Sequence, residues 1–125
     1  MPNNIPDIIA MATSGRGAPK PDKGTPDPTR LLSGKYETQT WNHFSSDDGR
    51  LFCGVWESTK GKVAVSYDEW EFCHIISGEV ILQKQGSRKS WTFKKGDAFI
   101  IPAGFKGTWE TVKKLRKHYV ILMPK

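Results

Sequence analysis

The 125-residue sequence lacks the apolar periodicity of an amphipathic helix, and it lacks any apolar run long enough to span a membrane. It has only two cysteines, Cys53 and Cys73, and no Cys-x-x-Cys pair of the kind found in zinc knuckles and redox sites. No basic segment precedes an apolar core at the N-terminus, so a signal peptide is not expected. These absences predict a cytoplasmic protein with reduced cysteines and no membrane partner.

Basic residues outnumber acidic ones and give a formal net charge of +6. They gather in residues 84–95 and 113–117, and the second stretch holds Lys113, Lys114, Arg116 and Lys117. Both stretches lie around expected turns, where charge normally faces solvent. No recognition helix, aromatic RNA-binding pair or zinc finger accompanies them, so nucleic acid is not expected as a partner.

Residues 1–35 are predicted to form an N-terminal arm. Residues 12–35 are rich in Pro, Gly, Ser and Thr without periodicity, which indicates an extended or disordered segment. The stretch IPDIIAM within the arm fits either one helical turn or an apolar clasp. We expect the arm to cover a sheet edge or to cross to a partner subunit.

Residues 36–125 are predicted to form one all-β domain, because strand-sized runs alternate with turn signals that contain glycine. Turns are expected at Ser77-Gly78 and at the stretch VKK, residues 112–114. The predicted strands are 36–44, 51–58, 61–67, 69–76, 78–84, 90–94, 97–101, 107–112 and 116–123. Many short strands of this kind are typical of a sandwich or a barrel.

The run 69–76 carries polar residues on one face of its predicted strand. Because side chains alternate, Glu69, Glu71 and Cys73 share a face, while the opposite face is large and apolar apart from His74. A polar row on a central strand is costly unless it lines a cavity or forms hydrogen bonds. Small closed barrels often hold a ligand in such an interior.

Two stretches, EFCHIISGEVIL and GDAFIIPAGFKGTWE, resemble the two conserved motifs of the cupin superfamily. Glu71 and Gly78 fit the end of the first motif, and Gly96, Pro102 and Gly104 fit the second. With LRKHYVIL, the combination is similar to a small single-domain cupin family whose profile is named after ureidoglycine aminohydrolase. The resemblance covers roughly residues 30–123 and implies a cupin, or RmlC-like, jelly-roll β-barrel of two antiparallel sheets.

The same resemblance implies that the usual cupin metal site is missing. The two motif-one histidines fall at Val65 and Tyr67, and the motif-two histidine falls at Gly107. The manganese ligands of the ureidoglycine aminohydrolase pattern, a Glu, two His and a Gln, leave only Glu71 at the matching positions. A divalent ion needs several pre-placed donors, so no metal cofactor is expected.

Other residues are weaker candidates for a non-standard metal site. His74 lies on the opposite face from Glu71 and joins it only through a bulge. The sequence does not fix which way His43 and His118 face, so both remain candidates to form a site with Glu71 and Cys73. The loss of the motif-two histidine at Gly107 is expected to leave space near Glu71, unless that glycine serves a turn.

The predicted binding residues are those expected to point into the barrel: Tyr67, Glu69, Glu71, Cys73, Trp109 and Trp56. Trp109 is included because it lies two residues beyond Gly107. Burial disfavours the charged form of Glu71 unless a cation or donor pairs with it, which suits an acid–base group or a ligand anchor. Alternatively, Glu71 is structural and bonded to Tyr67, to Trp109 Nε1 or to the backbone. Cys73 is a candidate nucleophile, but the sequence assigns no general base to activate its thiol.

Three functions follow from these observations. The first is metal-free binding of a small organic molecule in the barrel, with no claim that a reaction occurs. The second is an enzyme of small nitrogenous or carbohydrate-like metabolites that uses Glu71 as its acid–base group. The third is a structural or oligomerisation module whose interior is filled by its own aromatic side chains. Sheet edges and the N-terminal arm favour a homodimer in every case.

Overall fold

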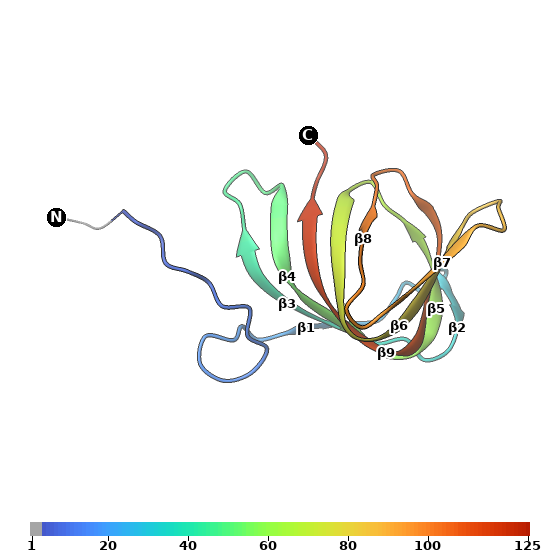
Figure 1. Cartoon of the computed structure of the whole chain (residues 1–125), viewed down its shortest axis with the longest axis horizontal. Helices are drawn as coiled ribbons and strands as arrows, with labels where there is room; N and C mark the ends of the chain where they lie inside the picture. The colour runs from blue at the N-terminus through green and yellow to red at the C-terminus, as the bar shows by residue number, and fades with distance from the viewer. Residues whose placement is uncertain (1–3) are drawn as a thin grey trace.

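A computed structural model describes residues 4–125, and over that range the chain forms nine β-strands and no helix (Figure 1). Within these residues there is accordingly no helix long and apolar enough to cross a membrane. The strands are β1 (Asp22–Gly24), β2 (Leu31–Ser33), β3 (Thr38–Ser45), β4 (Leu51–Ser58), β5 (Gly61–Ser66), β6 (Trp70–Lys84), β7 (Ser90–Lys94), β8 (Ala98–Ile101) and β9 (Lys106–Leu122). The all-β prediction is confirmed.

The strands pair antiparallel in one sheet that curls into a barrel (Figure 1). Its strand order is β1-β3-β4-β9-β5-β2, and β6 pairs with β7, β8 and β9. The first half of β9 pairs with β5 and the second half with β4, while β6 runs beside both halves. The two long strands therefore join the two sides of the barrel into one hydrogen-bonded sheet.

Two predicted turns are absent, and the runs beside them are continuous strands. The expected turn at Ser77-Gly78 lies inside β6, and the expected turn at VKK lies inside β9. The pairing of these strands instead shifts register between Ile75 and Val80, which marks a bulged region. Gly78 has a φ of 92°, and a Cβ there would clash with the Lys114 carbonyl oxygen, so glycine is needed for a bulge rather than for a turn.

The bulged region changes which residues of β6 face the interior. Cys73 and Ile75 are fully buried before it, and Val80 and Leu82 are buried after it. Odd-numbered residues thus point inward in the first half of the strand and even-numbered residues in the second. This switch places the apolar residues Val80 and Leu82, rather than Glu79 and Ile81, inside the barrel.

The barrel core is a cluster of buried residues contributed by most of the long strands. It includes Cys73, Ile75 and Leu115, each 0% exposed, and Trp109, 2% exposed. Phe93 and Phe99 stack against the cluster with ring centroids 3.9 Å apart. This core fills one part of the interior and borders the cavity described below, because Tyr36 and Trp109 belong to both.

The N-terminal arm covers two sheet edges, as predicted, through two short strands that were not expected. β1 pairs with β3, and β2 pairs with β5. The arm is also held by His43 Nε2 at 2.7 Å from the Ala12 carbonyl oxygen. Of the two alternatives for IPDIIAM, the helical turn is absent. The segment runs away from the barrel and leaves Ile8 97% exposed (Figure 1).

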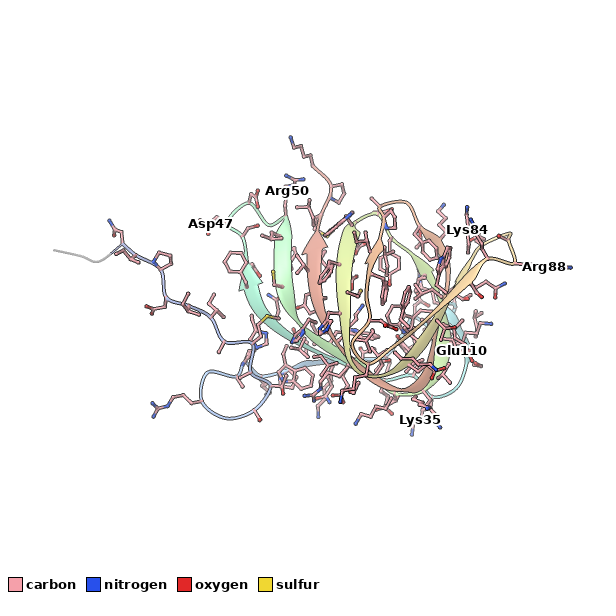
Figure 2. The ribbon with its side chains drawn as sticks, viewed as in Figure 1. Lys35, Asp47, Arg50, Lys84, Arg88 and Glu110 are labelled. Carbon is pink, nitrogen blue, oxygen red and sulfur yellow. The ribbon has the colours of Figure 1, made fainter. Side chains whose placement is uncertain are left out.

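Most charged side chains lie on the outside of the barrel. Figure 2 shows Lys84 and Arg88 on the hairpin between β6 and β7, and Asp47 and Arg50 at the turn between β3 and β4. The first basic stretch thus lies around a hairpin, as predicted. The second stretch lies within β9, and one of its members points inward.

Candidate functional site

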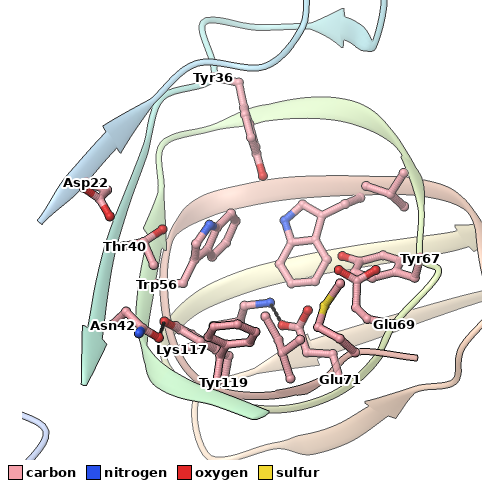
Figure 3. A pocket seen from close by; sticks show the side chains of 15 residues that line it. Asp22, Tyr36, Thr40, Asn42, Trp56, Tyr67, Glu69, Glu71, Lys117 and Tyr119 are labelled. Carbon is pink, nitrogen blue, oxygen red and sulfur yellow. Dashed lines mark hydrogen bonds and ion pairs between the residues drawn. The ribbon is translucent and has the colours of Figure 1, made fainter. Parts of the chain in front are cut away.

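A cavity of about 550 Å³ lies within the barrel. Its lining comes from β1, β3, β4, β5, β6 and β9 and from the segments beside them (Figure 3). The lining residues are Asp22, Tyr36, Thr40, Asn42, Phe52, Trp56, Val65, Tyr67, Glu69, Glu71, Trp109, Lys117, Tyr119, Ile121 and Met123. Aromatic and aliphatic side chains make up most of this wall.

A buried ion pair between Lys117 and Glu71 is the polar centre of the cavity. Lys117 Nζ donates a hydrogen bond to Glu71 Oε2 at 2.6 Å, and the two side chains are 5% and 6% exposed. Lys117 lies opposite Ile75 on the neighbouring strand, so its long side chain extends back past Cys73 to reach Glu71. The ammonium lies 3.3 Å from Cys73 Sγ, which itself donates to Glu71 Oε2 at 3.2 Å.

Two tryptophan rings hold the ammonium from its other sides. Lys117 Nζ lies 4.8 Å from the ring centroid of Trp56 and 4.5 Å from that of Trp109. The two rings meet edge to face with centroids 5.5 Å apart. Because the faces of indole rings are electron-rich, both contacts favour the charged lysine.

The pKa shifts at this site agree with a stable ion pair. Burial alone would lower the pKa of Lys117, but the interactions with Cys73, Glu71 and Tyr67 outweigh burial and raise it. Burial raises the pKa of the Cys73 thiol to about 12, although Lys117 acts in the opposite direction. Burial also raises the pKa of Tyr67 well above its ordinary value. At neutral pH the lysine is charged, and the thiol and the phenol are neutral.

Hydrogen bonds outside the ion pair fix the cavity wall. Trp109 Nε1 donates to Thr111 Oγ1 at 3.0 Å, and Thr111 shares a 2.6 Å hydrogen bond with Ser58. On the opposite side, Tyr119 donates to Asn42 Oδ1 at 2.8 Å. These contacts hold the indole and the phenol in place.

The structure brings the six predicted site residues together. Tyr67, Glu69, Glu71, Trp109 and Trp56 line the cavity, whereas Cys73 is not part of the lining but is buried in contact with Glu71. Glu71, however, does not bond to Trp109 Nε1, one of the partners that the sequence analysis gave for a structural Glu71. Trp109 Nε1 bonds to Thr111 instead, and Glu71 pairs with a lysine that the sequence analysis placed among solvent-facing charges.

Lys117 is the residue that the sequence analysis missed. Alternation from Trp109 along an unbroken strand would have placed Lys117 on the inward face, with Leu115 and Tyr119. The predicted turn at residues 112–114 interrupted that count. A second signal was the buried Glu71, which needs a cation nearby.

The histidines lie outside the cavity. His74 and His118 face each other on adjacent strands β6 and β9, with their Nδ1 atoms 3.2 Å apart. His43 bonds to the arm. Burial, and then the charges of His74 and His43, lower the pKa of His118.

The donor set at the cavity does not fit a metal ion. Val65 and Tyr67 occupy the motif-one positions, and the one carboxylate at the third position is bonded to an ammonium. Over residues 4–125, no three side chains of His, Cys, Asp or Glu are grouped so that they could hold a metal ion. The Lys117 ammonium supplies the positive charge beside Glu71.

Gly107 does not leave space beside Glu71, contrary to the expectation. A Cβ at Gly107 would clash with the main-chain carbonyl oxygen of Gln83 and would lie 3.1 Å from the Phe105 ring. Gly107 is paired with Lys84 on β6 and with Val65 on β5. This glycine therefore serves the close approach of β9 to β6, and it is not part of the cavity wall.

Comparison with known families gives one match. The profile described as the EutQ-like cupin domain matches residues 45–119, which includes most of the strands that form the cavity. A search of curated proteins finds no match.

Many solved structures share this fold. One is a DUF861-family protein of unknown function from Pseudomonas syringae, with a TM-score of 0.73 and 25% identity; the alignment covers 82% of this chain and 44% of that protein. Another is the EutQ protein of Clostridium difficile, with a TM-score of 0.62 and 22% identity over 70% of this chain and 63% of that protein. The chain thus spans less than two thirds of either protein.

Proposed function

Because the chain belongs to the family of EutQ-like cupin domains, we propose that it binds a small organic molecule in the barrel cavity without a metal ion. The observation that carries this proposal is a mostly apolar cavity of about 550 Å³ with a buried lysine–glutamate pair in its wall. Ligand pockets of roughly 300–1,000 Å³, mostly apolar with a few placed polar groups, are typical of small-molecule sites.

The alternative of a structural module is less well supported, because that module needs a side-chain-filled interior. The aromatic side chains here surround the cavity rather than fill it. The wall also carries groups that would serve a ligand: the hydroxyls of Tyr67 and Thr40, and the carboxylate of Glu69. None of these three side-chain groups takes part in a hydrogen bond or ion pair within residues 4–125.

The test is a screen of small organic fragments by NMR, read on the indole N–H resonances of the tryptophans. Trp56 and Trp109 line the cavity, whereas Trp91 lines a separate apolar hollow outside it. Fragments that bind in the cavity are expected to shift the first two resonances and to leave that of Trp91 unchanged. If no fragment shifts Trp56 or Trp109, the binding function is wrong.

A cavity-filling variant locates the binding without disturbing the ion pair. Thr40 lines the cavity, and its neighbour Gln39 faces the outer side of the same strand. Thr40→Phe is expected to weaken the binding of every cavity fragment, whereas the matched variant Gln39→Phe is expected to leave it unchanged. Binding should also survive treatment with a chelator, because the residues of the cavity do not fit a metal ion. Elemental analysis of the purified protein is expected to find no stoichiometric metal.

The second candidate is an enzyme of small nitrogenous metabolites, similar to ureidoglycine aminohydrolase, with Glu71 as the acid–base group. It is favoured by the contact of Glu71 with two proton donors, Lys117 and Cys73. Release of ammonia from ureidoglycine, lost in Glu71→Gln but kept in the exterior variant Glu110→Gln, would support this candidate. Fragment binding without turnover would leave binding alone as the function.

A further inference from the structure

The charged groups around the cavity are out of balance. Three carboxylates line it, those of Asp22, Glu69 and Glu71, against the single ammonium of Lys117. These four groups leave two negative charges in excess, although the chain as a whole carries +6. The excess is therefore a property of the cavity and not of the protein's overall charge.

The ammonium of Lys117 is already neutralised, so it is not available to a ligand anion. Its short contact is with Glu71, and both side chains are almost fully buried. The two remaining carboxylates, Glu69 and Asp22, form no ion pair within the described part of the chain. Arg30 borders an adjoining hollow that Glu69 also lines, but the two do not form an ion pair.

Glu69 and Asp22 lie on different sides of the cavity. Figure 3 shows Glu69 beside Tyr67, and Asp22 across the cavity beside Thr40. Glu69 is half-buried whereas Asp22 is exposed. Water and salt screen an exposed carboxylate more strongly, so Glu69 is the better partner for a ligand charge.

The walls of the cavity also favour a positive charge. Six aromatic residues line it: Tyr36, Phe52, Trp56, Tyr67, Trp109 and Tyr119. The faces of aromatic rings attract cations, and Lys117 already uses two of these rings in this way. An apolar body of a ligand would lie against the remaining rings and against Ile121 and Met123.

We propose, on the basis of the binding function above, that the ligand is a small organic amine with an apolar or aromatic body. Its ammonium group is held by Glu69, with Asp22 adding to the negative potential, and its apolar part lies along the aromatic wall. Anions of the same size are excluded, because the lining of the cavity offers them no free cation.

Three probes of nearly the same shape test this proposal: phenethylammonium, 2-phenylethanol and phenylacetate. Calorimetry at neutral pH and low salt is expected to show the amine binding about ten-fold more tightly than the alcohol, and the acid most weakly. In Glu69→Gln the affinity for the amine falls to about that for the alcohol, while the affinity for the alcohol does not change. The matched exterior variant Glu110→Gln leaves all three affinities unchanged.

The outcomes separate the two proposals. If the alcohol or the acid binds as tightly as the amine, the amine inference is wrong and the binding function stands. The same conclusion follows if cations are no more frequent than neutral molecules and anions among the fragments that shift the Trp56 and Trp109 resonances. If Glu69→Gln binds the amine as the wild type does, Glu69 is not its partner and the inference is overturned. Absence of any cavity fragment overturns both.

Discussion

Removal of one member of the Lys117–Glu71 pair leaves the other member charged and buried without a partner. In Lys117→Met, the Glu71 carboxylate loses its ammonium partner and retains the weak hydrogen bond from the Cys73 thiol. We expect a loss of about 3–5 kcal/mol in the free energy of unfolding, measured by urea denaturation. The double variant Lys117→Met/Glu71→Leu is expected to recover most of this loss, because it buries no charge.

The matched control for this prediction is Lys113→Met. Lys113 is on the same strand, but its side chain is 72% exposed and lies 4.0 Å from Glu79. Its replacement is expected to change the free energy of unfolding by no more than about 0.5 kcal/mol. Equal losses in Lys113→Met and Lys117→Met would contradict the importance of the buried pair.

The two cysteines are expected to differ in reactivity. Burial raises the pKa of Cys73 to about 12, and Cys73 is 0% exposed, whereas Cys53 is half-buried. Since the thiolate is the reactive form, iodoacetamide at pH 8 should modify Cys53 first and Cys73 only when the protein unfolds. Mass spectrometry of peptides from a time course checks this order. Modification of Cys73 in the folded protein at the rate of Cys53 would refute it.

His118 is expected to make stability depend on pH. Burial, followed by the charges of His74 and His43, lowers its pKa from the ordinary 6.5. The unfolded chain therefore binds a proton at a higher pH than the folded chain does, so stability is present above about pH 6.5 and falls as the pH drops toward the folded pKa. Thermal unfolding between pH 7.5 and 5 should show this decline, and His118→Gln should reduce it. An unchanged slope in the variant would contradict the assignment.

At the level of strands, the alternation of side chains predicted which residues share the cavity but not how long the strands are. Parity placed Glu71 and Cys73 inward because the first half of β6 is regular. Tyr67 and Glu69 also line the cavity, although they lie in the connection between β5 and β6. The bulged region around Gly78 could not be predicted in the same way, since a glycine next to a serine also fits a turn. At residues 112–114 the stretch VKK was interpreted as a turn although β9 continues through it, and this moved Lys117 out of the predicted site.

The close approach of β9 to β6 at Gly107 gives a further prediction. Because a Cβ there would clash with the Gln83 carbonyl oxygen, Gly107→Ala is expected to reduce the free energy of unfolding by about 1–3 kcal/mol. Gly86→Asn serves as the control, because Gly86 has open space around it and asparagine tolerates its φ of 68°. Chemical denaturation of the two variants compares them. A Gly107→Ala protein as stable as the control would contradict this prediction and would show that β6 and β9 move apart at little cost.

At the level of the whole molecule, the predicted homodimer remains a proposal with structural support. Ile8 is 97% exposed and Ile9 is 51% exposed on an arm that extends from the barrel, and Ile100 and Leu122 are exposed on its outer surface. Exposed apolar groups of this kind favour association. Light scattering is expected to give twice the 14.1 kDa mass of one chain, and deletion of residues 1–11 is expected to weaken the dimer. A monomeric wild type at micromolar concentration would refute the proposal.

The sharing of β6 and β9 between both sides of the barrel has a consequence for how the molecule comes apart. Loss of the hydrogen bonds on one side is coupled to the other side, because β6 and β9 run through both and pair with strands of each. Unfolding is therefore expected to be a single cooperative event without a half-folded state. The cavity is bounded by strands from both sides, so the binding site and the global fold are lost together.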